Sequence, residues 1–105
     1  MTDTRQGVTV MTTFEETYAA VVAEAEAEGP AAVAELRLLE DRYRLASDLI
    51  GRRQALHMTQ QQLAAASGIR QSEISRIESG HGNPTLKTIG ALARALGAEL
   101  RIASS

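Results

Sequence analysis

The chain has 105 residues, of which 44% are hydrophobic but only 3% are aromatic, and its net charge is −2. This length suits one small domain with a modest core and additional arms. The lack of cysteine excludes disulfides and thiolate metal sites, and without a signal peptide or a run of 18 apolar residues we expect a cytoplasmic protein with no membrane association.

The charges are distributed unevenly along the chain. Residues 1–41 carry two basic and nine acidic side chains, a net charge of −7. Residues 42–105 carry nine basic and four acidic side chains, a net charge of +5. The basic part is suited to approach phosphates, whereas the acidic part should avoid them and face a basic partner.

The first 41 residues predict a leader and a helical extension. Residues 1–12 show no helical period and are expected to be disordered. Thr13 and Glu16 have the spacing of a capping box, which predicts a helix from about Phe14 to Glu28. Gly29-Pro30 would end it. Its apolar stripe either binds a partner or packs on the domain or on a dimer mate; it consists of Phe14, Tyr18, Val21, Val22 and Ala25.

A second helical stretch should run from Ala31 to about Leu56, as one long helix or as two with a break near Asp41. Its later part would form the first helix of a compact domain. Gly51 lies inside it, and close helix packing is the expected reason for a glycine there. The inward stripe is Leu36, Leu39, Tyr43, Ala46, Leu49, Ile50 and Arg53.

The stretch from Thr59 to Gly80 predicts two short helices joined by a tight turn. Thr59 and Gln62 form a second capping box, and Gly68 ends the first helix where a positive φ is needed. The apolar residues expected beneath are Leu63, Ile69, Ile74 and Ile77. The second helix would turn outward the groups that read base edges in a DNA major groove, namely Gln71, Ser72, Ser75 and Arg76. An ordinary helical hairpin with a polar surface is the alternative.

The rest of the chain predicts one more helix and a short strand. Thr85 would cap a helix over Leu86–Leu96, and Gly97 would end it. Its inward residues should be Leu86, Ile89, Leu92, Ala93 and Leu96. Residues 99–103 alternate polar and apolar side chains, which predicts a strand that needs a neighbouring chain, or else a frayed tail.

These features resemble the DNA-binding domain of the XRE family, the Cro/cI-type repressors and their bacterial relatives. The resemblance covers roughly residues 44–97. It implies an all-α, lambda-repressor-like helix-turn-helix domain of four to five helices, to which the residue patterns add an N-terminal helical extension and a short C-terminal strand. The matching pieces are Arg53, Thr59-Gln60, Leu63-Ala64, Gly68, Ile74-Ser75, Ile77-Glu78, Gly80, Pro84-Thr85 and Ala95-Leu96-Gly97.

The resemblance also implies roles for single residues. Arg53 and Glu78 would form a structural ion pair, although a phosphate contact is an alternative for Arg53. Bases would be read by Gln71, Ser72, Ser75 and Arg76. The expected phosphate contacts are Gln60, Arg70, Asn83, Thr85 and Lys87. A homodimer would place two recognition helices about 34–36 Å apart on a near-palindromic operator.

The arrangement is most similar to HigA-type antitoxins of toxin–antitoxin pairs. This implies a basic, RelE/HigB-like ribonuclease partner and autoregulation of the operon, with the stripe from Phe14 to Val22 as the candidate toxin-binding surface. A stand-alone phage- or operon-type XRE repressor is the main alternative, and an adaptor that binds protein without DNA is another.

The predicted organisation is a disordered leader at 1–12, an acidic helical extension at 13–41, the helix-turn-helix domain at 42–98, and a strand and tail at 99–105. We expect no enzyme, no cofactor and no metal site. No paired carboxylates, nucleophile with a base, or metal cluster can be recognised. His57 and His81 lack partners at ligand spacing and are expected to be a turn and a loop residue.

Overall fold

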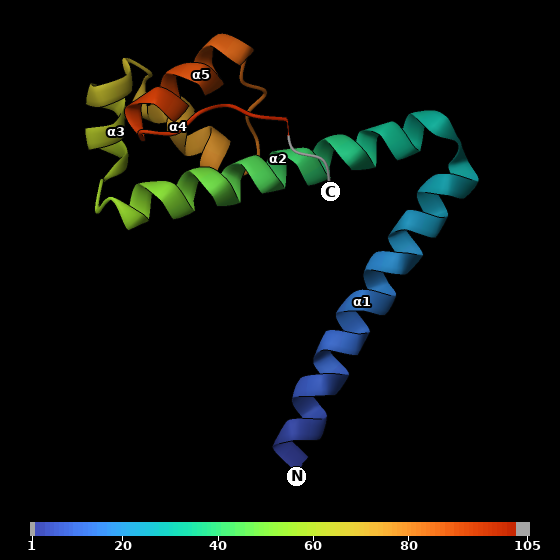
Figure 1. The fold of residues 1–105 in the computed structure, drawn as a ribbon. Coiled ribbons are helices and arrows are strands. Elements are labelled where there is room, and N and C mark those ends of the chain that lie inside the picture. The colour runs from blue at the N-terminus through green and yellow to red at the C-terminus, as the bar shows by residue number, and fades with distance from the viewer. Residues whose placement is uncertain (1, 103–105) are drawn as a thin grey trace. The chain divides into compact units, whose positions relative to one another are not determined.

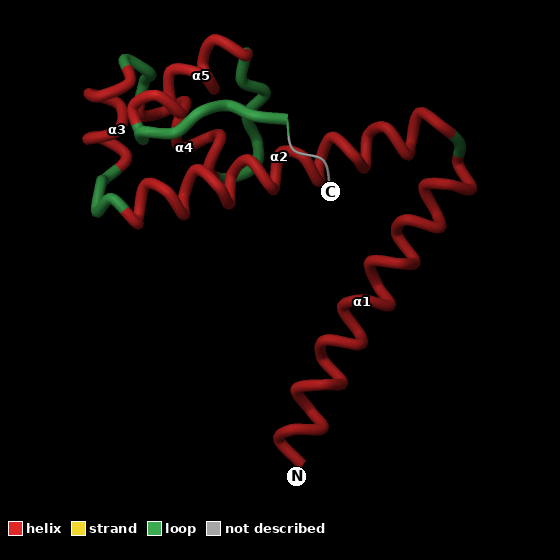
Figure 2. The backbone as a smooth tube through the Cα atoms, viewed as in Figure 1, coloured by secondary structure: helices red, strands yellow, loops and turns green. Residues whose placement is uncertain are grey.

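The computed structural model describes residues 2–102, with side chains described from Glu15 onward. Five α-helices occupy this part, and turns and loops connect them (Figures 1 and 2). The chain forms two compact units, Met1–Leu38 and Leu39–Ser105. The helices are α1 (Thr2–Glu28), α2 (Pro30–Ala55), α3 (Gln60–Ser67), α4 (Gln71–Glu78) and α5 (Leu86–Ala95).

The N-terminal leader differs from the prediction. Helix α1 already begins at Thr2, so Thr13 lies within a helix and does not cap one. Residues 2–12 contain one glycine and no proline, and a helix extends through such a segment because each added residue forms a further backbone hydrogen bond. The end at Glu28 agrees with the prediction. Gly29 has a φ of +119°, and Pro30 begins α2.

Helix α2 is continuous, without a break near Asp41. Its buried residues are Ala46 and Leu49, whereas Leu39 and Tyr43, predicted to face inward, are 52% and 73% exposed. The predicted inward-facing stripe extended too far along α2 because the other helices that form the core are short. Helices α3, α4 and α5 have 8, 8 and 10 residues and are only about 12–15 Å long, so they cover part of α2.

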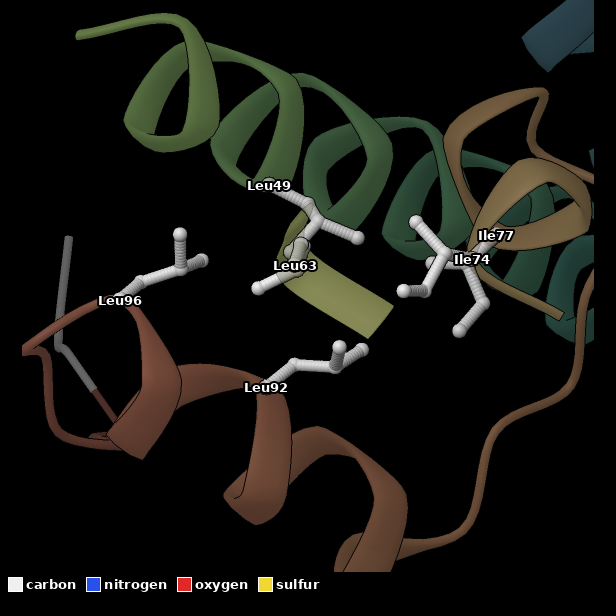
Figure 3. Close-up of a cluster of buried hydrophobic side chains, with 6 residues drawn as sticks. All are labelled: Leu49, Leu63, Ile74, Ile77, Leu92 and Leu96. Carbon is white, nitrogen blue, oxygen red and sulfur yellow. The ribbon is translucent and has the colours of Figure 1, made fainter. Parts of the chain in front are cut away.

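One cluster of aliphatic side chains forms the core of residues 39–105. Leu63 from α3 and Ile74 from α4 are fully buried at its centre (Figure 3). Helix α3 contacts both α4 and α5. Ile69, expected in the core, is partly buried against it. The buried members of the cluster are Leu49, Leu63, Ile74, Ile77, Leu92 and Leu96.

Two further expectations about packing were wrong. Leu86 is 72% exposed because it is the first residue of α5, beyond the turns that carry Leu92 and Leu96 into the core. Gly51 is exposed, and a Cβ atom built on it would meet nothing within 4 Å, so helix packing does not require glycine there.

The C-terminal strand is absent from the described residues. Residues 98–102 follow α5 without regular secondary structure, and Leu100 and Ile102 are 51% and 103% exposed. A strand needs the backbone of a neighbour to pair its N–H and C=O groups, and the described part of this chain offers no strand. The remainder of the predicted segment, 103–105, lies outside the described residues. Within them, no helix combines the length and apolar character needed to span a bilayer.

Candidate nucleic-acid interface

Local chemistry fixes the two helices of the motif. The Thr59 side chain accepts a hydrogen bond from the Gln62 backbone N–H at 3.0 Å, and the Gln62 side chain accepts one from the Thr59 N–H at 2.8 Å. The predicted capping box is therefore present. Gly68 follows α3 with a φ of +77°, and its N–H donates to the Ala64 carbonyl at 2.9 Å. The turn into α4 thus uses a conformation that costs glycine little.

Helix α4 has one buried and one exposed face. Ile74 and Ile77 are 0% and 2% exposed and anchor the helix to the core. The four residues predicted to read bases are all exposed: Gln71, Ser72, Ser75 and Arg76. Arg70, directly before the helix, is exposed as well. The eight-residue helix therefore presents amide, hydroxyl and guanidinium groups outward from an apolar support, as a recognition helix requires.

Arg53 connects α2 to the end of α4. Its Nε donates to Oε2 of Glu78 at 2.7 Å, and its Nη2 donates to Oε1 at 2.8 Å. Its Nη1 donates to the Met58 carbonyl at 2.8 Å, which also holds the loop before α3. The two side chains are only 14% and 5% exposed. This bidentate pair is the structural contact that the resemblance implies. With the bond to Met58, it engages three of the five guanidinium N–H groups of Arg53 inside the domain.

The hydrogen bonds continue from this pair to the exposed face of α4. Gln60 Nε2 donates to Glu78 Oε1 at 3.0 Å, and Gln71 Nε2 donates to Gln60 Oε1 at 2.8 Å. Gln60, considered from the sequence only as a phosphate contact, therefore links the ion pair to Gln71. Sequence spacing gave no signal for this link because the two glutamines are 11 residues apart on different helices. The bond fixes the Gln71 amide with its carbonyl oxygen available as an acceptor.

The ion pair also shifts two protonation equilibria. Burial raises the pKa of the Glu78 carboxyl, but hydrogen bonds from Arg53 and Gln60 and the Arg53 charge outweigh it, so the pKa is lowered overall. The hydrogen bond to Glu78 raises the pKa of Arg53 against the opposing effect of burial. Both groups are therefore held in their charged forms.

The loop after α4 folds back on the end of that helix. The Arg76 carbonyl accepts hydrogen bonds from the His81 and Gly82 N–H groups at 3.0 and 3.2 Å and from the Ser79 hydroxyl at 2.9 Å. His81 Nδ1 lies 3.1 Å from the same hydroxyl. A Cβ atom on Gly82 would lie 3.0 Å from Ile77 Cγ1 and 3.3 Å from its backbone, so a larger residue there would require Ile77 or the loop to shift slightly. This closure was not predicted.

The predicted phosphate contacts in and after this loop are exposed: Asn83, Thr85 and Lys87. Thr85 caps α5 by accepting from the Thr88 N–H at 3.2 Å, so its hydroxyl has a local partner. His57 has a φ of +56°, consistent with the turn role expected for it.

The candidate partner-binding residues lie in α1. Tyr18 and Val21 are 41% and 44% exposed, and Val22 is half-buried. The side chain of Phe14 lies outside the described residues. Ala25, from the same stripe, is buried at 7% exposure. Ala25 is therefore shielded from solvent, while Tyr18 and Val21 present apolar surface.

Comparisons with known proteins agree on the helix-turn-helix. The family model HTH_3, described as helix-turn-helix, matches residues 50–102. An uncharacterized HTH-type transcriptional regulator of Haemophilus influenzae is 43% identical over 68 residues, which cover 65% of this chain and 69% of that protein. The antitoxin HigA1 of Mycobacterium tuberculosis is 36% identical over 84 residues, which cover 80% of this chain but only 56% of the antitoxin. No solved structure gives a significant match.

Proposed function

Since the chain belongs to the XRE-type helix-turn-helix family of DNA-binding regulators, we propose that it is a sequence-specific transcriptional repressor that acts as a homodimer on a near-palindromic operator. Its place of action would be the cytoplasm, where bacterial operators lie. The observation that carries the proposal is the outward polar face of α4 above the buried Ile74 and Ile77.

The contacts around Gln71 support a role in reading bases. A bidentate contact to adenine needs one donor and one acceptor from the same amide. The bond from Gln71 Nε2 to Gln60 uses one of the two N–H groups and leaves the other together with Oε1. Arg76, one turn further on the same exposed face, carries the group that best matches guanine. Phosphates around this site would be contacted by Arg70, Asn83 and Lys87. Gln60 would donate its remaining N–H to a phosphate as well.

Binding measurements on single variants test this assignment. Gln71→Ala and Arg76→Ala should each weaken binding to the cognate promoter fragment by about 1–3 kcal/mol, with little change on random DNA. Fluorescence anisotropy at fixed salt measures both affinities. Gln61→Ala is a matched control, because Gln61 is an exposed glutamine of α3 outside the hydrogen-bonded network. Equal losses on cognate and random DNA would contradict base reading.

We further propose that the chain is the antitoxin of a type II toxin–antitoxin module. The 36% identity to HigA1 supports this over 80% of the chain. The acidic charge of residues 1–41 and the exposed Tyr18 and Val21 suit a basic protein partner such as a RelE/HigB-like ribonuclease. The second candidate, a stand-alone repressor, is favoured by the similarity to the HTH-type regulator of Haemophilus influenzae.

Co-expression with the product of the neighbouring open reading frame distinguishes the two. An antitoxin should form a complex with a basic protein and restore growth of cells that express it. Tyr18→Ala with Val21→Asp should weaken this complex, whereas Leu56→Asp, which changes an exposed leucine in the turn after α2, should not. A neighbour that is neither toxic nor bound by the chain would favour the stand-alone repressor.

A further inference from the structure

The first turn of α4 carries an acidic side chain, Glu73, which has no part in the base-reading contacts proposed above. It is the third residue of the eight-residue helix and directly precedes the buried Ile74. The residue is half-buried, at the border between the buried face and the exposed face of α4. Side chains three residues apart on a helix are neighbours, so Glu73 lies next to Arg76, the residue expected to contact guanine.

The Glu73 carboxylate does not cap the helix. Arg70 is the N-cap of α4, and an acidic side chain three residues later can accept a hydrogen bond from the N-cap N–H. In α3 the corresponding Gln62 accepts such a bond from the Thr59 N–H at 2.8 Å. In residues 15–102, whose side chains the structure describes, the Glu73 carboxylate has neither a hydrogen-bond partner nor an ion-pair partner. Its oxygens are therefore available as acceptors.

The motif contains one other acidic residue, which is paired. Between Thr59 and Gly80 the sequence has only Glu73 and Glu78 as acidic residues, and Glu78 is bound to Arg53. An unpaired carboxylate on a helix that approaches DNA is repelled by phosphates and lowers the affinity for DNA of any sequence. Glu73 therefore opposes binding unless the DNA supplies a hydrogen-bond donor.

The base edges in the major groove decide which donor fits. A carboxylate can only accept hydrogen bonds. Cytosine presents its N4 amino group there without an acceptor, whereas adenine presents an acceptor beside its amino group, and guanine and thymine present acceptors alone. Cytosine is therefore the base that a carboxylate can recognise without facing another acceptor.

We propose that Glu73 is a specificity-determining residue that accepts a hydrogen bond from N4 of a cytosine next to the guanine contacted by Arg76. The inference rests on the proposed function, in which α4 reads the operator. On DNA without a cytosine at this position, the same carboxylate finds no donor and is repelled by phosphates and base acceptors. Glu73 thus increases the difference in affinity between cognate and random DNA, partly by weakening the complexes with random DNA.

Selection by the full chain from duplexes with a randomised core tests the inference. The unsubstituted chain should select cytosine at one position of each half-site. Glu73→Gln should select adenine at that position, because an amide pairs with adenine, and should keep the preferences at all other positions. Glu73→Ala should select no particular base there. Unchanged preferences at every position in both variants would overturn the inference and leave Glu73 as a charge that only stabilises the N-terminal end of α4.

Affinities for the selected operator and for random DNA give a second test. Glu73→Ala should weaken operator binding by about tenfold but strengthen binding to random DNA by about two- to fivefold. Glu26→Ala removes an exposed carboxylate from α1 in the first unit, so it should change both affinities by the same factor. Fluorescence anisotropy at fixed salt measures both affinities. A common factor for Glu73→Ala would contradict the proposed contact.

The selections also separate this inference from the proposed function. If Gln71→Ala and Arg76→Ala alter the selected sequence while both Glu73 variants leave it unchanged, only the role of Glu73 is refuted. If the unsubstituted chain selects no common sequence, base reading by α4 fails, and the inference fails with it. Since glutamine keeps the shape of the glutamate side chain, the Glu73→Gln selection remains decisive even where Glu73→Ala destabilises α4.

Discussion

Glu78 connects three helices through hydrogen bonds to its carboxylate. Its carboxylate accepts two hydrogen bonds from Arg53 of α2 and one from Gln60 of α3, while it belongs to α4 itself. With 5% side-chain exposure it receives little solvation from water. The position of the recognition helix relative to its neighbours is therefore fixed by charge-assisted bonds as well as by the aliphatic core.

Removing Arg53 should destabilise the domain strongly. Arg53→Ala leaves the Glu78 carboxylate buried without its cation, which costs about 3 kcal/mol of unfolding free energy. Urea unfolding followed by circular dichroism measures the change. Arg44→Ala, which removes an exposed arginine of the same helix, should change stability by less than about 0.5 kcal/mol. Similar effects of the two substitutions would contradict the structural role of the pair.

The same pair predicts a pH dependence. The folded state lowers the pKa of Glu78, so the stabilisation is fully present above the ordinary glutamate pKa of about 4.3. It is lost as the pH falls through the lower folded-state value. Unfolding free energies measured from pH 7 down to pH 3 should therefore fall less steeply for Glu78→Gln than for the unsubstituted chain. An unchanged slope would show that other carboxylates dominate acid unfolding.

At the scale of elements, substitution by alanine should change the stability of the domain in opposite directions at two glycines, one at a turn and one inside a helix. Gly68 has a φ of +77° at the turn before α4, so Gly68→Ala should destabilise the domain by about 1–2 kcal/mol. Gly51 lies within α2 with no atom within 4 Å of an added Cβ, so Gly51→Ala should stabilise it by about 1 kcal/mol. Thermal unfolding of both variants measures the pair, and shifts of the same sign would contradict this assignment.

Element ends could be predicted from sequence because their causes are local. The Thr59–Gln62 box and the glycines at 29 and 68 act within a few residues of their own positions. The exposure of Leu39, Tyr43 and Leu86 could not be predicted, since it depends on how far the short helices α3 to α5 extend. The link between Gln60 and Gln71 could not be predicted either, because it needs two helices placed in space. The strand expected at the tail failed because pairing requires a neighbour that the described chain lacks.

At the scale of the whole molecule, the opposite charges of the two parts should affect how the affinity for DNA depends on salt. The net charge of residues 42–105 is +5, but that of residues 1–41 is −7, so attraction to phosphates depends on the local basic side chains. Lys87→Ala should weaken binding to all sequences about equally and reduce the slope of log K against log salt by about 1. A loss confined to the cognate operator would instead assign Lys87 to base reading. Titrations at several salt concentrations on cognate and random fragments measure both quantities.

The aliphatic cluster of the second unit has a consequence for how DNA binding responds to heat. Leu63 and Ile74 are fully buried in the same cluster that supports both helices of the motif, and a domain of this size has only a few kcal/mol of net stability. Loosening this cluster and losing the recognition surface are thus one event. Under the proposed repressor function, warming toward the melting temperature of the domain would therefore release DNA in the same cooperative step that unfolds the core.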